Sequence, residues 1–168
     1  MKPRQDQVAL VVAVDDLIGH LEHHREFSGE IETSLLVGEV VVRGPIEITG
    51  TLTGTVEGVR AVYQVSAHAV LICARCLDEW TETLVVEGKQ HFGRVPDEDG
   101  YAIVAGTVDL GGPAIDELSL GIPAAPVCSS DCKGLCPICG TDLNEDPCDG
   151  HGEESDSPFA ALRQLFDP

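Results

Sequence analysis

Hydrophobic and polar positions alternate along three stretches of the chain. The apolar positions of residues 46–56 are Ile46, Ile48, Leu52 and Val56. Glu47 and four threonines lie between them, and this period of two predicts a strand with one buried face. Residues 61–72 and 80–92 are also extended in character. The expected buried side of residues 61–72 consists of Ala61, Tyr63, Val65, Ala67, Ala69 and Leu71. Three consecutive strands with short links predict an antiparallel meander.

Two weaker patterns follow the meander. Residues 101–110 are expected to give one more strand. The sequence Gly111-Gly112-Pro113 then precedes a short helix, because proline favours a first helical turn. One face of this helix consists of Ala114, Ile115, Leu118 and Ile122.

Helices are also expected near both ends of the chain. At the N-terminus, Asp15 or Asp16 is expected to cap a helix that runs through Leu17 and Leu21 to His24. At the C-terminus, a serine cap followed by proline and helically spaced apolar residues predicts a short terminal helix over residues 157–166.

The composition changes this picture because the chain is strongly acidic. It contains 29 Asp and Glu against 10 Lys and Arg, a formal net charge of −19. Such a surface repels phosphate backbones and anionic lipid headgroups, so extensive nucleic-acid binding is not expected. The longest apolar run, residues 8–14, is far shorter than the roughly 20 residues that span a bilayer. Without a signal-peptide pattern either, we expect a cytoplasmic protein with reduced thiols and no membrane partner.

Seven cysteines and one histidine form four closely spaced pairs. These are Cys73 and Cys76, Cys128 and Cys132, Cys136 and Cys139, and Cys148 and His151. A gap of two or three residues lets one turn direct two ligand atoms onto one ion, and structural zinc takes four ligands. Eight ligands suit two closed sites, so we expect one or two structural zinc ions.

The spacing leaves the pairing of these ligands open. The last four of them, from Cys136 to His151, can close locally at little entropic cost. In this preferred grouping, Cys73 and Cys76 share a second site with the pair at 128 and 132. In the alternative, the four cysteines from 128 to 139 form one site and leave Cys73 and Cys76 to the pair at 148 and 151.

We therefore expect an α+β fold rich in β-structure. It combines an antiparallel, meander or barrel-like sheet with few short helices and a C-terminal zinc-binding module. The expected division is a β-rich core over residues 1–122 with Cys73 and Cys76 at a hairpin tip, a cysteine-rich zinc module over 123–152, and an acidic linker with a short helix over 153–168.

The chemistry-bearing residues do not indicate an enzyme. Sites closed by four protein ligands leave no position for water and are structural. His20 and His24 would share a helix face, but Glu22 is misplaced for a metalloprotease pattern, so we interpret them as an exposed polar face. The repeated glycines at 50, 54 and 58 lack the Gly-Lys-Ser/Thr of a phosphate loop and indicate bends or close contacts. The alternative is a zinc-dependent or Cys-x2-Cys redox enzyme of unknown substrate.

These residues resemble the YceD family. The resemblance rests on Cys73-Ala-Arg-Cys76-Leu77, on the segment from Asp109 to Pro123, and on the run from Cys128 to Asn144. It covers about residues 40–166 and is closest to cysteine-rich members from high-GC Gram-positive bacteria. Related sequences tend to end the cluster with Cys-x-Cys, where this chain has Cys148 and His151.

The resemblance implies a non-enzymatic factor in assembly of the large ribosomal subunit and accumulation of its RNA. The implied partners are a large-subunit precursor, and in it a basic ribosomal protein or a limited site on the RNA, with no small-molecule substrate. Because each phosphate contact needs a Lys or Arg, the acidity favours a basic protein. A narrower contact with RNA is expected only if the fold gathers Arg75, Lys89, Arg94 and Lys133.

Overall fold

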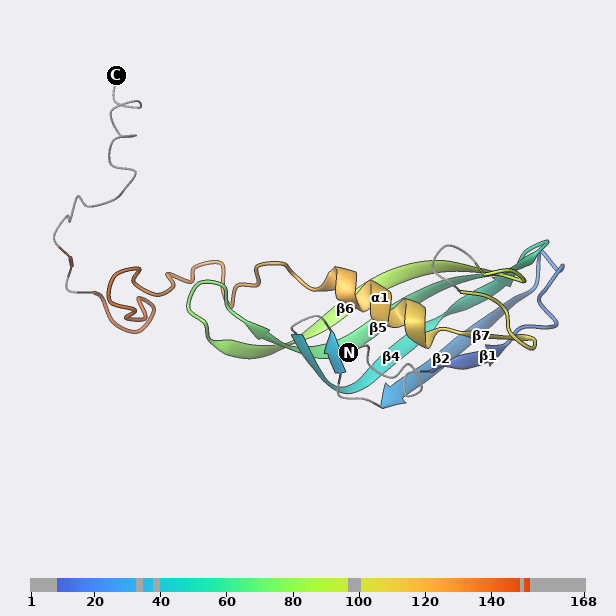
Figure 1. The fold of residues 1–168 in the computed structure, drawn as a ribbon, viewed down its shortest axis with the longest axis horizontal. Coiled ribbons are helices and arrows are strands. Elements are labelled where there is room, and N and C mark those ends of the chain that lie inside the picture. The colour runs from blue at the N-terminus through green and yellow to red at the C-terminus, as the bar shows by residue number, and fades with distance from the viewer. Residues whose placement is uncertain (1–8, 33–34, 38–39, 97–100, 149, 152–168) are drawn as a thin grey trace, which may run out of the picture.

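The computed structural model describes residues 9–32, 35–37, 40–96, 101–148 and 150–151, which form an elongated molecule (Figure 1). Its elements are β1 (Val11–Ala13), β2 (His24–Glu32), β3 (Leu35–Val37), β4 (Val40–Gly54), β5 (Gly58–Ile72), β6 (Glu79–Gly93), β7 (Thr107–Asp109) and α1 (Gly111–Gly121). The main sheet has the order β2-β4-β5-β6, and β3 also pairs with β4. Strands β1 and β7 form a separate antiparallel pair.

Strands β4, β5 and β6 confirm the predicted antiparallel meander. The pairing of β5 with β6 is continuous, from Gly58 opposite Gly93 to Ile72 opposite Glu79. Strand β4 instead shifts its register between Arg43 and Glu47. All the residues predicted for the inner side of β5 are buried. The alternation in the sequence therefore identifies the face of the sheet that packs against the core.

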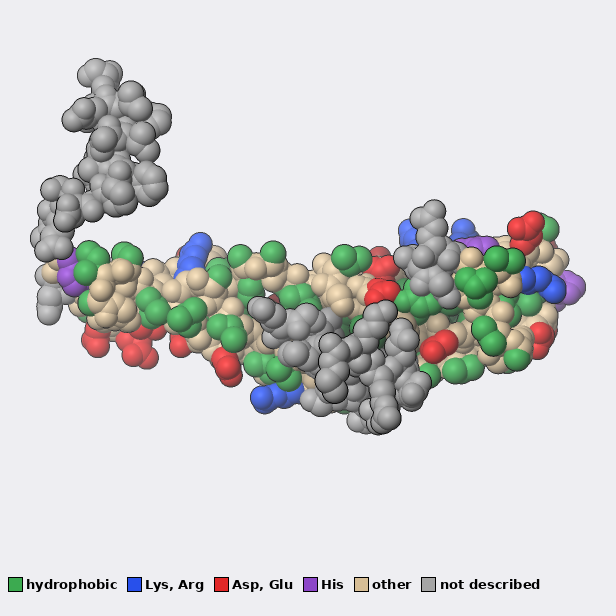
Figure 2. All heavy atoms as spheres, viewed as in Figure 1, with side chains coloured by type: hydrophobic (Ala, Val, Ile, Leu, Met, Phe, Trp, Pro, Cys, Tyr) green, Lys and Arg blue, Asp and Glu red, His purple; other side chains and the backbone are tan. Residues whose placement is uncertain are grey.

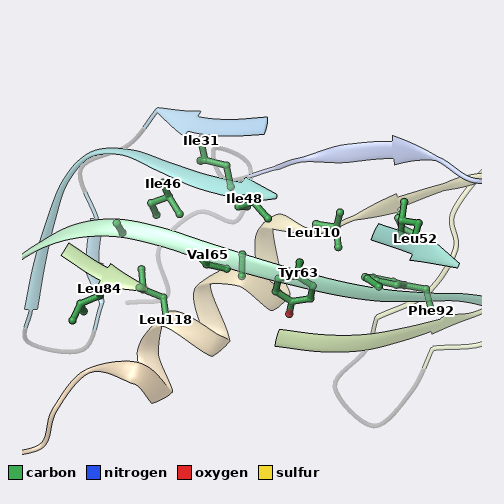
Figure 3. Close-up of a cluster of buried hydrophobic side chains, with 14 of the residues drawn as sticks. Ile31, Ile46, Ile48, Leu52, Tyr63, Val65, Leu84, Phe92, Leu110 and Leu118 are labelled. Atoms are coloured by element: carbon green, nitrogen blue, oxygen red, sulfur yellow. The ribbon is translucent and has the colours of Figure 1, made fainter. Parts of the chain in front are cut away.

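Helix α1 packs against β6 and β5 and covers this face. Figure 3 shows Leu118 of α1 directed toward the same apolar cluster as Leu84 of β6 and Val65 of β5. Ala114 and Leu118 are buried as predicted, and Ile115 and Ile122 are partly buried against the same cluster. No charged or polar side chain is buried in the part of the chain that the structure describes.

Tyr63 lies between two glycines on the covered face. It is opposite Gly50 of β4 and Gly88 of β6, and a Cβ atom at either glycine would collide with Tyr63. Gly50 is therefore a close-contact glycine, as its place in a strand pattern indicates. Burial raises the pKa of the Tyr63 hydroxyl, and the carboxylates of Glu117 and Asp116 raise it further.

The predicted N-terminal helix is wrong. Residues 15–19 form a turn, and β2 begins at His24. Val14 donates its backbone N–H to Gly106 at 2.8 Å, and Gly19 donates to Thr55 at 2.9 Å. Because so short a helix is marginal on its own, these tertiary hydrogen bonds decide the conformation of the segment.

The strand predicted over residues 101–110 is largely wrong as well. Only Thr107–Asp109 form β7, because Ala105 and Gly106 adopt positive φ angles of 49° and 77° in a tight turn before it. Val56, predicted to face the core, is 72% exposed because β4 ends at Gly54. The helix predicted over residues 157–166 lies outside the described residues. In the described part, no helix is long and apolar enough to cross a bilayer.

Candidate metal centres

The tip of the hairpin between β5 and β6 is a tight turn that presents two thiols. Leu77 donates its backbone N–H to the carbonyl oxygen of Cys73 at 3.0 Å, and Cys73 donates to that of Asp78 at 2.9 Å. These bonds direct the side chains of Cys73 and Cys76 toward the same side of the turn. Leu77 has a positive φ of 66°. Such a conformation costs a non-glycine residue about 1–2 kcal/mol.

The second Cys-x2-Cys pair lies in a turn with the same backbone hydrogen bonds. Gly140 donates to the carbonyl oxygen of Cys136 at 2.9 Å, and Cys136 donates to that of Thr141 at 2.8 Å. Gly140, directly after the second thiol, Cys139, has a φ of 75°, which glycine adopts readily. The chain therefore builds the same ligand-presenting turn twice.

The hairpin tip and the segment after α1 together form one group of four sulfurs, which we call site one. Its members are Cys73, Cys76, Cys128 and Cys132, and all four sulfurs lie within 4.8 Å of one another. The Sγ atoms of Cys73 and Cys132 are 3.8 Å apart, and those of Cys76 and Cys128 are 3.6 Å apart. Trp80 of β6 packs against this cluster.

A second group, site two, contains three sulfurs and one imidazole nitrogen. Its members are Cys136, Cys139, Cys148 and His151, again within 4.8 Å of one another. The Nε2 atom of His151 lies 3.3 Å from the Sγ atom of Cys136 and 3.1 Å from that of Cys148. The Sγ atoms of Cys139 and Cys148 are 3.8 Å apart. The structure thus brings the eight atoms together in the preferred grouping and not in the alternative.

Hydrogen bonds lower the pKa of one cysteine in site one, Cys73, and of two in site two, Cys136 and Cys139. The backbone N–H groups of Cys128 and Cys76 lower the pKa of Cys73 to about 6. The hydroxyl and backbone N–H of Thr141 lower the pKa of Cys139 to about 6. The thiolate is the form of cysteine that binds metal ions.

Two side chains connect the sites. Asn144 accepts the backbone N–H of Lys133 at 2.8 Å and directs its own amide toward the Sγ atom of Cys132 at 3.5 Å. The Arg75 guanidinium donates to the carbonyl oxygen of Cys132 at 2.9 Å, while the Arg75 carbonyl oxygen accepts the N–H of Leu135. The loop that bears site two is therefore attached directly to the hairpin tip.

Sequence reasoning did not assign roles to Asn144, Thr141 and Trp80. For Asn144, its place at the end of the run that resembles the YceD family was the available signal. For Thr141, the signal was its position two residues after Cys139. Trp80 follows the hairpin tip closely, but only the folded structure shows that its side chain packs against site one.

Each site could hold one metal ion. All seven cysteines are free, and the sulfur separations are far longer than the roughly 2.05 Å of a disulfide. Four protein ligands leave no coordination position for water, so such an ion would crosslink the chain rather than activate a substrate. Elsewhere in the described residues, His20, Glu22 and His24 do not form a comparable group. His68 and His91 contact the hydroxyls of Thr83 and Thr55.

The four basic residues considered for RNA contact are not gathered into one patch. Arg75 and Lys133 lie at the cysteine-rich end, whereas Arg94 follows the opposite end of β6. Lys89 is exposed in the half of β6 nearer to Arg94. A strand of 15 residues, the length of β6, is about 50 Å long.

Acidic side chains instead gather at the cysteine-rich end. Figure 2 shows them side by side on one side of this end. Asp131, Glu145 and Asp146 are exposed, and Asp142 is partly exposed. The end of the molecule that contains both metal centres therefore presents a negative surface.

A family model described as large ribosomal RNA subunit accumulation protein YceD matches residues 61–166. This range contains most of β5, all of β6 and α1, and all eight residues of the two candidate metal centres. No solved structure matches the chain.

Curated relatives agree with the family match. An uncharacterised protein of Mycobacterium tuberculosis is 36% identical over 121 residues, covering 67% of this chain and 58% of the relative. One from Mycobacterium leprae is 34% identical over 133 residues, covering 74% and 60%. The chain thus spans about three fifths of these relatives' length. A chloroplastic protein of Arabidopsis thaliana, named large ribosomal RNA subunit accumulation protein YCED homolog 1, is 36% identical over 58 residues, 34% of this chain and 18% of the relative.

The family model covers more than half of the chain, and it includes both ligand-presenting turns and the helix between the two parts of site one. The chain belongs to the YceD family.

Proposed function

We propose that this protein is a non-catalytic factor in large-subunit ribosomal RNA accumulation, which holds a basic ribosomal protein during assembly of the subunit. The family description and the name of the Arabidopsis relative support the ribosomal context. The observation that supports a binding rather than catalytic role is the pair of four-ligand groups at the acidic end. A metal ion with four protein ligands would hold the surrounding surface in one conformation, and it would have no free coordination position for a reacting molecule.

Zinc is the metal that we assign to both sites. Four thiolates, or three with an imidazole, are the ligand sets of structural zinc. With Zn–S bonds of about 2.3 Å at tetrahedral angles, two sulfurs would lie about 3.8 Å apart. The separations of 3.6 and 3.8 Å in site one, and of 3.8 Å in site two, fit this geometry.

The charge distribution favours a basic protein over RNA as the partner. Residues 123–151 contain five acids and one base. A basic protein surface would be attracted to this acidic surface, which speeds association and favours basic partners. The phosphates of RNA would be repelled by it. The separation of Arg94 from Arg75 and Lys133 leaves no concentrated basic site among the four residues considered.

Redox catalysis by the Cys-x2-Cys pairs is the rival function. Such catalysis uses a thiol at the start of a helix, but Cys73 follows a strand and Cys136 precedes a turn. Each of these thiols also lies within a four-ligand group. These placements favour structural metal sites.

Affinity capture tests the proposed function. The tagged protein is incubated with ribosomal proteins and precursors at low and moderate salt, with and without ribonuclease. We expect a basic large-subunit protein to be enriched at low salt, to be lost at moderate salt, and to be insensitive to ribonuclease.

A matched variant makes the test specific. The combined substitution Asp131→Asn, Glu145→Gln and Asp146→Asn removes exposed charge without touching a ligand residue, and it is expected to abolish capture at unchanged zinc content. Capture that survives this variant, or enrichment of RNA alone, would refute the adaptor role.

A further inference from the structure

Strand β6 forms one edge of the main sheet along its whole length. It has 15 residues, pairs with β5 without a register shift, and contains no proline. At the far end of β6, Gly93 forms a parallel bridge with Ala102. Within the described part of the chain, no strand pairs with the outer side of residues 79–87, which therefore present a strand edge.

Such an edge is a binding surface unless it is blocked. About half of the backbone N–H and C=O groups of an edge strand point away from the sheet, ready to pair with another strand. Proteins commonly block edges with charged side chains, most often lysine, or with proline or a bulge. In β6 the single lysine, Lys89, lies in the half near Gly93, so the half from Glu79 to Glu87 has no lysine, proline or bulge, and its charged side chains are all acidic.

The unblocked half of β6 is surrounded by negative charge. Glu79, Glu82 and Glu87 of the strand are exposed. On α1, which packs against β6, Asp116 and Glu117 raise the pKa of Tyr63, the residue opposite Gly88 of β6. These carboxylates would attract a positively charged segment to the edge.

Exposed side chains also indicate which residues an added strand would contain. Val85, 55% exposed, lies on the uncovered face between Thr83 and Glu87. In an added strand, side chains on this face would contact Val85 and Glu87 alternately along the strand. Because successive residues of a strand point to opposite faces, a segment in which pairs of β-branched residues alternate with pairs of basic residues matches both.

We propose that the edge of β6 from Glu79 to Glu87 binds an extended, basic segment of the partner protein by strand addition. Main-chain hydrogen bonds would supply affinity, and the acidic side chains would select the basic sequence. The inference rests on the proposed function, because the segment belongs to the same basic partner. A second copy of this chain is the less suitable occupant, because each copy has a net charge of −19.

The position of the edge explains why site one is part of the binding surface. Cys73 donates its backbone N–H to Asp78, one residue before β6 begins, and Trp80 contacts the cysteine cluster. Site one therefore fixes the start of the strand that the partner would extend. The acidic end and the strand edge then form one continuous negative surface.

The test uses a fluorescent peptide in which Val-Val and Lys-Lys pairs alternate, and the same peptide with N-methyl groups on all of its backbone amides. The methyl groups leave the charge unchanged and remove the donors needed for strand pairing. We expect the first peptide to bind and the methylated one to bind at least about tenfold more weakly, because several hydrogen bonds are lost. Equal affinities would show that only charge is recognised and would overturn the proposal.

Hydrogen exchange locates the contact. On addition of the unmethylated peptide, the hydrogen-exchange rates of alternate amides from Thr81 to Glu87 are expected to fall by about tenfold or more. Protection elsewhere in the molecule, with none in β6, would refute the site. Protection of these amides in the free protein that rises with its concentration would identify a second copy as the occupant and also refute it.

Two charge variants provide the matched control. Glu82→Lys on β6 is expected to lower the affinity for the peptide by about fivefold at low salt, because it replaces an exposed ion pair with a repulsion. Glu26→Lys makes the same charge change on β2, at the opposite side of the sheet, and is expected to change affinity less than about twofold. Equal effects of both variants would contradict a site on β6.

The outcomes separate this inference from the proposed function. If a basic ribosomal protein is captured but leaves the β6 amides unprotected, the function stands and the strand-addition site is wrong. If the peptide protects β6 but no ribosomal protein is captured, the site stands and the assembly role is wrong.

Discussion

Leu77 and Gly140 occupy equivalent positions in the two ligand-presenting turns, although only glycine suits a positive φ. Both donate a backbone N–H to the first cysteine of their turn, and their φ angles differ by only 9° (66° and 75°). In Leu77 the side chain is 62% exposed, so packing does not offset its conformational cost. The hairpin of β5 and β6 must hold this residue in place.

Substitutions at Leu77 and Gly140 are expected to change the stability of the metal-bound protein in opposite directions. Gly140→Ala is expected to destabilise the metal-bound protein by about 1 kcal/mol, because alanine resists the positive φ. Leu77→Gly is expected to be neutral or stabilising by up to about 1 kcal/mol, because it removes that resistance. Resistance of bound zinc to a competing chelator measures both effects, and equal losses in the two variants would contradict the shared turn geometry.

The ligand residues give a second prediction at this scale. The protein is expected to contain two zinc ions per chain, and Cys73→Ser and Cys136→Ser are each expected to retain one. Trp80, the single tryptophan, packs against site one, so its fluorescence should change in Cys73→Ser and stay unchanged in Cys136→Ser. Metal analysis and emission spectra check this, and loss of both ions in either variant would show that the sites are not independent.

Sequence reasoning found the ligands but not the residues that support them. Spacing alone identifies a chelating pair, because two sulfurs within one turn reach the same ion. The contact of Asn144 with Cys132 spans 12 residues, and the contact of Cys76 with Cys128 spans 52. Contacts of this kind depend on how the elements pack, which periodicity does not describe.

At the scale of elements, the three longest strands were predictable, whereas the nine-residue β2 and the shorter strands were not. Strands β4, β5 and β6 each have 15 residues, so their alternation is visible above local noise. Strands β1, β3 and β7 have three residues each, too few to show a period. The N-terminal helix was predicted wrongly for a related reason. A helix so short is marginal on its own, so hydrogen bonds to neighbouring segments determine its conformation.

The elements also differ in how much they depend on metal. Between residues 126 and 151, the buried residues that the structure describes are Cys132, Gly134 and Cys136. The one bridge in this part joins Leu135 to Asp142. The sheet and α1, in contrast, enclose a large apolar cluster of their own.

Metal removal should therefore separate the two parts. In the presence of a chelator and a reductant, amides of residues 126–151 are expected to exchange rapidly, while those of β4 and β5 remain protected. Hydrogen exchange with mass spectrometry checks this, and the untreated protein is the control. Rapid exchange throughout β5 would show instead that the metal sites hold the entire fold together.

At the scale of the whole molecule, charge is distributed along the long axis. The cysteine-rich end is negative, and Arg94 lies beyond the other end of β6. The net charge of −19 follows directly from the sequence, but a residue count cannot say which charges share a face. The fold supplies this information, and it separates basic residues that the sequence suggested as one contact.

Site one also has a consequence for the order of events during synthesis. Its two halves are 52 residues apart between Cys76 and Cys128. At about 5–20 residues per second, the first pair of thiols is made roughly 3 to 10 s before the second pair. The completed centre therefore forms only after the sheet and helix have been translated, and a truncated chain keeps an open, two-ligand tip. Zinc bound at site one, as proposed, would therefore be retained by finished copies of the protein and not by unfinished ones.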